Sequence, residues 1–93
     1  MPASPQYLTL SADEVATVAF DEDWEWVEVL NLTGTADVFF RADGQDPGVA
    51  ATGSEVVGAA IGASLTVAVP TAGPTMVKLI SAGTPKIAVR GTR

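Results

Sequence analysis

The sequence predicts an all-β protein, folded as a single antiparallel β-sandwich or jelly-roll-like domain with seven or eight short strands. Three observations predict this class. Apolar side chains recur at every second position in most segments, whereas the helical spacing of three and four residues is absent. Turn-forming residues separate these segments every eight to twelve residues or so. The 93 residues are 47% hydrophobic, which is enough for one core and too few for a second domain.

The first half of the chain contains four expected strands. A short strand over residues 7–10 is followed by a turn, and extended structure resumes over residues 15–20. Residues 24–32 form the clearest strand, because Val27 and Val29 point to one side and the residues between them to the other. An Asn-Leu-Thr-Gly-Thr turn then leads into residues 37–42, which we expect to pair with the preceding strand as a hairpin.

The second half begins with a segment of a different kind. Residues 48–64 are rich in Gly and Ala, and we expect a long loop with one weak strand near residues 55–57 at a sheet edge. Further strands are expected over residues 64–69, 76–81 and 86–90, each bounded by Gly and Pro turns. The side chains expected to fill the core are Leu8, Leu10, Val15, Val18, Phe20, Val27, Val29, Val38, Phe40, Leu65, Val67, Val69, Val77, Leu79, Ile87 and Val89.

No targeting signal is expected at the N-terminus, and no membrane span is expected in the uncharged stretch over residues 56–77. Residues 1–6 contain Pro2 and Pro5 and are expected to form an extended arm that lies on a neighbouring molecule. This segment lacks the basic start and apolar run of a secretory signal. Residues 56–77 contain too many Gly and Pro for a membrane helix. We therefore expect a soluble protein with no membrane contact.

Few side chains in this sequence are able to take part in catalysis. His and Cys are absent, which removes the usual general base, the thiolate nucleophile and zinc sites built from imidazole or sulfur. Ser54, Ser64 and Ser81 have no imidazole to activate them. The glycines of residues 53–62 do not form a phosphate-binding loop, because no Gly-Lys-Ser/Thr follows them. The Asp43-Gly44-Gln45-Asp46 segment is interpreted as a turn, because the spacing of a calcium loop is missing. We therefore expect that the chain is not an enzyme and that it binds no metal ion and no cofactor.

Charge is divided unevenly along the chain. Residues 1–55 hold all 11 acidic residues and one base, a net charge of −10, whereas residues 56–93 hold four bases and no acid, which gives −6 overall. Binding to nucleic acid is not expected from so acidic a chain. Two interpretations stay open: opposite charges meet between two copies, through Lys78, Lys86 and Arg90, or they neighbour one another within one copy.

The acidic run from Asp21 to Trp26 places carboxylates beside two indoles. One hypothesis is a sugar-binding platform built from Trp24 and Trp26; the alternative is that they cover a sheet face or an intersubunit contact. Glycoside hydrolysis is not expected, because so small a chain leaves no room for an adequate cleft. The side chains expected at an interface are Tyr7, Trp24, Trp26, Lys78, Lys86 and Arg90.

Several segments resemble a known family. Val27-Glu28-Val29-Leu30-Asn31, Gly34-Thr35-Ala36-Asp37-Val38-Phe39-Phe40, Asp43-Gly44 and Pro47 match a run found in small β-sandwich virion proteins of tailed phages, and residues 77–83 and 87–91 resemble their last hairpin. The resemblance covers about residues 27–91. It implies a protein that is made in the host cytoplasm and decorates the outer capsid, commonly as a homotrimer, with the major capsid protein as partner. It implies no catalytic residue.

Three functions follow from these observations. The first is a capsid decoration protein located on the virion surface. The second is a head–tail connector or tail-tube component, which would form hexameric rings. The third is a small carbohydrate-binding module that uses Trp24 and Trp26.

Overall fold

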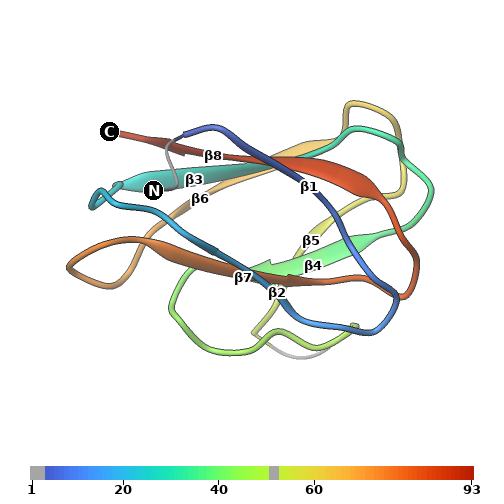
Figure 1. Cartoon of the computed structure of the whole chain (residues 1–93), viewed down its shortest axis with the longest axis horizontal. Helices are drawn as coiled ribbons and strands as arrows, with labels where there is room; N and C mark the ends of the chain where they lie inside the picture. Colours follow the sequence, from blue (N-terminus) through green and yellow to red (C-terminus); the bar gives the residue numbers. More distant parts are fainter. Residues whose placement is uncertain (1–3, 51–52) are drawn as a thin grey trace.

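Eight short β-strands make up the fold. The structure, a computed structural model, describes residues 4–50 and 53–93, and no helix occurs among them (Figure 1). The all-β class expected from the alternation of apolar residues is therefore confirmed. The strands are β1 (Gln6–Thr9), β2 (Ala16–Ala19), β3 (Trp26–Asn31), β4 (Val38–Arg41), β5 (Glu55–Val57), β6 (Ser64–Ala68), β7 (Met76–Ile80) and β8 (Lys86–Thr92).

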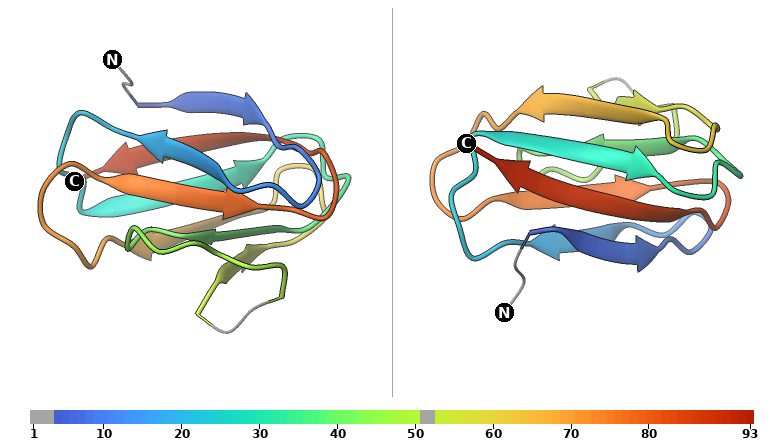
Figure 2. Two further views of the ribbon diagram at one scale, coloured as in Figure 1. Left: turned by 60° about the horizontal axis from the view of Figure 1, so that its bottom comes forward. Right: turned by 90° about the horizontal axis from the view of Figure 1, so that it is seen from above.

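The fold consists of two four-stranded sheets. They pack face to face, as Figure 2 shows from two sides. Sheet A has the strand order β1-β8-β3-β6 and sheet B the order β2-β7-β4-β5. All neighbours are antiparallel, and the first strand pairs with the last, the second with the seventh, the third with the sixth and the fourth with the fifth. The chain thus resembles one long hairpin rolled into a sandwich. Eight strands arranged in this way form a jelly roll, as the sequence predicts.

The two hairpins expected from the sequence are wrong. β3 and β4 lie in different sheets, and so do β7 and β8. At the end of β3, the Asn31 side chain donates hydrogen bonds to the carbonyl oxygens of Ala36 (2.9 Å) and Gly58 (3.1 Å) and accepts one from the Gly34 N–H (2.8 Å). These bonds lead the chain across to sheet B. After β7, Ser81 Oγ donates to the Asp37 carbonyl oxygen (2.7 Å) at the crossing back to sheet A.

The core lies between the two sheets. Every side chain expected there is buried or packs partly buried against the core, except Val15, which is 41% exposed. Val15 directly precedes β2, whose inward positions are Ala16 and Val18, so the alternation of the strand turns Val15 outward. Val57 of β5 is buried as well, although it is not among the side chains expected in the core.

The glycine-rich segment and the N-terminus complete the fold. β5 forms at the edge of sheet B, which confirms the weak strand expected near residues 55–57. Of the expected arm, Ser4 already contacts β8, because its Oγ accepts a hydrogen bond from the Gly91 N–H (3.0 Å), and Gln6 begins β1. Residues 1–3 and 51–52 lie outside the described residues. None of the described residues belongs to a helix able to cross a membrane.

Candidate functional site

The outer face of sheet A presents the largest share of the side chains expected at an interface. Val27, Val29, Ile87 and Val89 are buried in the core, so the even-numbered residues of β3 and β8 point to the other side of the sheet. The same alternation applies to the two edge strands. The side chains of this outer face are Tyr7, Thr9, Trp26, Glu28, Leu30, Ser64, Thr66, Ala68, Lys86, Ala88, Arg90 and Thr92.

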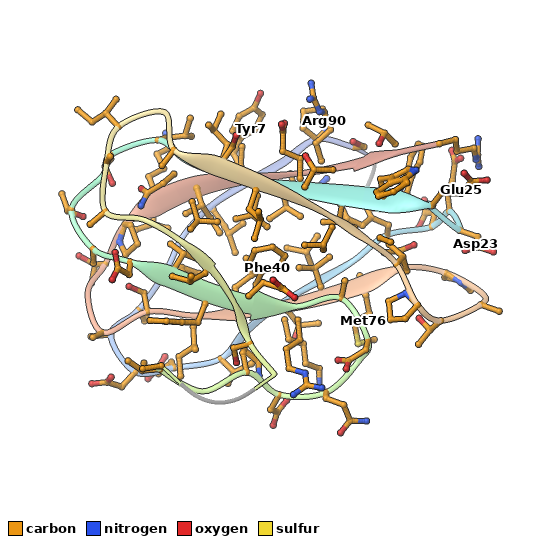
Figure 3. All side chains as sticks on the ribbon, turned by 180° about the vertical axis from the view of Figure 1, so that it is seen from behind. Tyr7, Asp23, Glu25, Phe40, Met76 and Arg90 are labelled. Atoms are coloured by element: carbon orange, nitrogen blue, oxygen red, sulfur yellow. The ribbon has the colours of Figure 1, made fainter. Side chains whose placement is uncertain are left out.

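A shallow depression of about 180 Å³ lies on this face, over β1, β8 and β3. Tyr7, with 63% of its surface exposed, and Arg90 both line it, and Figure 3 shows them on the same side of the molecule. We call it the Tyr7–Arg90 depression. Its full lining is Pro5, Tyr7, Glu28, Leu30, Leu32, Ala88 and Arg90.

Cross-strand pairing positions the polar groups of this depression. Arg90 lies directly opposite Glu28 in the β3–β8 register, and its Nη2 donates a hydrogen bond to Glu28 Oε1 at 2.7 Å. Ala88 lies opposite both Tyr7 and Leu30, and it supplies a small apolar contact between them. An exposed Tyr beside an Arg is a composition found at the energetic centres of protein interfaces. The depression is smaller than the roughly 300–1,000 Å³ typical of small-molecule pockets, which favours a flat macromolecular partner.

The outer face of sheet A brings together four of the six expected interface residues: Tyr7, Trp26, Lys86 and Arg90. Trp26 is 45% exposed. Lys86 is exposed and forms no ion pair within residues 4–50 and 53–93. Lys78 does not belong to this group, because it lies on the outer face of sheet B, where its Nζ contacts Asp46 Oδ1 at 3.0 Å.

Trp24 also lies apart from this face. Its ring meets Phe20 edge-on, with centroids 6.5 Å apart, and the Arg93 guanidinium lies 4.9 Å from the ring centroid. The ring occupies the space beside Gly91, where a Cβ atom would come within 2.2 Å of it. Trp24 therefore closes one end of the core, while Trp26 points outward from sheet A. The two indoles do not form one platform.

The acidic and basic halves of the chain meet within one copy. Lys78 pairs with Asp46, Arg90 with Glu28 and Arg93 with Glu22. Each pair joins a base from residues 56–93 to an acid from residues 1–55. The structure thus favours the second interpretation of the charge division, in which opposite charges neighbour one another within the fold.

The turn after β4 is held by an ion pair. Arg41 Nη2 and Nε both contact the Asp43 carboxylate, the closest approach being 2.6 Å, and Asp43 Oδ1 also accepts a hydrogen bond from the Gln45 N–H (3.0 Å). This occupies the Asp43 carboxylate, as expected of a turn. No group of three or more residues able to hold a metal ion occurs in the part of the chain that the structure describes. The hydrogen bond from Arg41 lowers the pKa of Asp43 below its ordinary value.

Replacing Asp43 by asparagine is expected to lower the melting temperature at pH 7 by less than about 5 °C, since surface ion pairs contribute little. Because the folded state lowers the Asp43 pKa, the ion pair stabilises the protein above the ordinary carboxyl pKa. That stabilisation is lost as the pH falls through the lowered value. The difference between Asp43→Asn and the native chain should therefore shrink below about pH 4 in thermal melts. A difference of equal size at every pH would contradict the assignment, and Asp23→Asn, at an exposed carboxylate, serves as control.

Glu28, Leu30 and Ala88 line the depression but are not among the interface residues expected from the sequence. The alternation of β3 and β8 places them on the outward side, which was the available signal. They lie beside Tyr7 only because β1 pairs with β8, a contact between the two ends of the chain.

Comparisons with protein-family models, curated proteins and solved structures find no match to this chain. What is established is a jelly-roll fold with a partly apolar, partly charged outer face on sheet A.

Proposed function

We propose that this chain is a structural virion protein, which binds the outer surface of a phage capsid and stabilises the shell. The observation that carries the proposal is the outer face of sheet A, where the exposed Tyr7 lies beside the Arg90–Glu28 ion pair above the small apolar side chain of Ala88. Such a face suits a broad protein partner better than a small substrate. The proposed partner is the major capsid protein, and no catalytic step is assigned.

Two further arguments support this role by analogy. The segments within residues 27–91 resemble small virion proteins of tailed phages. Jelly rolls build viral capsid domains, and they also build lectins. One fold serves many functions, so a jelly roll fits a capsid role and a lectin role equally well. The argument for the capsid role in particular comes from the outer face of sheet A.

The proposed mechanism is thermodynamic. A protein that binds the assembled shell and not its separate subunits adds its binding free energy to the stability of the shell. An oligomer that contacts several capsid subunits at once gains from effective concentration. The resemblance implies a homotrimer, which the mass of the purified protein tests separately.

Tyr7→Ala and Arg90→Ala are each expected to weaken binding to assembled capsids by about tenfold or more, since Tyr and Arg dominate the energetics of many interfaces. Both side chains are largely exposed, so the fold should be retained. Co-sedimentation with assembled capsids measures the affinity. Met76→Ala is the matched control, because Met76 is 38% exposed on the opposite sheet (Figure 3).

Different outcomes reject different parts of the proposal. Equal binding to assembled capsids and to unassembled subunits would contradict the proposed stabilisation of the shell. Weakening by Met76→Ala in place of Tyr7→Ala would assign the contact to sheet B. Absence of capsid binding, together with hexameric rings of the purified chain, would favour the head–tail connector or tail-tube component.

Carbohydrate binding receives less support from the site. The hypothesis needs Trp24 and Trp26 on one platform, whereas the Trp24 ring packs on Phe20 and beside Gly91. Trp26 alone stays exposed as an indole on the outer face of sheet A. Quenching of Trp fluorescence by oligosaccharides, lost in Trp26→Ala, would restore this candidate.

A further inference from the structure

β6 (Ser64–Ala68) leaves one edge of sheet A open. It is the outermost strand of the sheet, next to β3, and Figure 2 shows it along the border in the view from above. With five residues it is the longest of the four edge strands in the described chain; β1 and β2 have four and β5 has three. A long edge strand is able to pair with another strand unless something protects it.

The hydrogen-bond pattern shows which backbone groups of β6 face this edge. The Asn31 N–H bonds to the Ala63 carbonyl oxygen (2.8 Å), and the Val69 N–H bonds to the Glu25 carbonyl oxygen (2.8 Å). In an antiparallel ladder, bonded and non-bonded residues alternate. In the constant register of β3 and β6, the odd-numbered residues of β6 therefore bond to β3. The N–H and C=O groups of Ser64, Thr66 and Ala68 point away from β3, and none bonds to another described segment.

The usual protection of an edge strand is missing from β6. Charged side chains, proline and bulges normally prevent pairing between edges. Residues 56–77 contain no charged side chain, and proline is absent between Ser64 and Ala68. Outward from the sheet, Ser64, Thr66 and Ala68 are all small and exposed. Nothing in β6 would therefore repel a second uncharged strand, although the whole chain has a net charge of −6.

We propose that β6 pairs with β6 of a second copy of this chain, antiparallel across a two-fold axis at Thr66. In this register Thr66 faces Thr66 of the second copy, and Ser64 faces Ala68. The outward-pointing groups are those at residues 64, 66 and 68, so each of the three facing pairs forms two hydrogen bonds. The strand is thus complementary to itself, as a two-fold contact requires. The two copies of sheet A join into one continuous sheet of eight strands.

This pairing has a consequence for the outer face of sheet A. The Tyr7–Arg90 depression lies over β1, β8 and β3, away from the β6 edge, so it stays open in the dimer. A dimer presents two such depressions on one joined face. The inference does not depend on the identity of the proposed capsid partner. It also differs from the homotrimer that the resemblance implies, because a two-fold contact of this kind closes at two copies.

Thr66→Pro and Thr66→Lys test the pairing by sedimentation of the purified chain. Proline is tolerated on an edge strand where its missing N–H faces solvent, and lysine at residue 66 would place two like charges opposite each other. Each variant should raise the dissociation constant of the dimer by about tenfold or more. Thr9→Pro and Thr9→Lys are the matched controls, because Thr9 occupies the equivalent outward position on β1, at the other edge of sheet A, and should leave the constant unchanged.

Amide hydrogen exchange gives an independent readout. With rising protein concentration, the amides of Ser64, Thr66 and Ala68 should exchange more slowly, whereas those of Leu65 and Val67, already bonded within the chain, should not change. Thermal melts test whether the Thr66 variants remain folded, which is the expected result. A monomer at every accessible concentration, or a dimer insensitive to both Thr66 variants, overturns the proposal. A trimer with slowed amides at Tyr7 and Thr9 also overturns it, since β6 would then pair with β1 of the next copy.

Discussion

Replacing Asn31 by leucine is expected to lower the free energy of unfolding by about 3–5 kcal/mol, and the melting temperature by more than about 10 °C. Asn31 is fully buried, and its side chain bonds to Gly34, Ala36 and Gly58. Leucine fills a similar volume and makes none of these bonds. The Ala36 carbonyl oxygen and the Gly34 N–H, both in partly buried residues, then lose their partner, and each costs about 1–3 kcal/mol. The Gly58 carbonyl oxygen keeps the hydrogen bond that it accepts from the Ala60 N–H (2.9 Å).

The matched control for Asn31→Leu is Thr33→Ala. Thr33 lies in the same turn, but it is exposed and its hydroxyl accepts one hydrogen bond, from the Lys86 N–H (3.0 Å). Its loss should cost about 1 kcal/mol or less. Equal destabilisation by the two substitutions in chemical denaturation would show that the turn as a whole, and not the buried amide of Asn31, holds this end of the sandwich.

Asn31 also shows which part of the fold the local sequence does not predict. Asn and Gly between two alternating segments predict a turn, and a turn is present. In the fold this turn crosses to the other sheet, and the Asn31 side chain bonds there to Gly58, which lies 27 residues further along the chain. Such a distant contact is not visible in the local sequence. The inward side chains of β3 and β4 alternate in the same way in either case. Alternation therefore predicts the strands and most of the core, but not which strands pair.

The candidate site has the same limit. Period-two alternation is sufficient to place Trp26, Lys86 and Arg90 on the outward side of their strands. It does not reveal that Glu28 is the partner of Arg90, 62 residues away, because this contact requires the β3–β8 pairing. Trp24 precedes β3 and follows no strand pattern. Its position in the fold depends on Gly91, which has no side chain to exclude the indole ring.

The second large effect is expected for Gly34→Ala, which should lower the free energy of unfolding by about 3 kcal/mol or more. Gly34 has a φ of +66°, a conformation that costs an alanine about 1–2 kcal/mol. In addition, a Cβ at Gly34 would come within 2.4 Å of the Ile61 backbone nitrogen and 2.6 Å of the Ala60 carbonyl carbon. These are backbone atoms, so a rotamer change cannot relieve the overlap. The turn before β6 would have to move away from the Asn31 turn.

Gly44→Ala separates the conformational cost of a positive φ from the cost of the Cβ overlap. Gly44 has a φ of +81°, and no atom lies within 4 Å of the position where its Cβ would be. Alanine at Gly44 therefore has the conformational cost alone, about 1–2 kcal/mol. The excess of Gly34→Ala over Gly44→Ala, measured in urea, is the cost of separating the two turns. If the two substitutions destabilise the protein equally, the close packing of Gly34 on Ala60 and Ile61 does not contribute to stability, and Asn31 alone joins the turns.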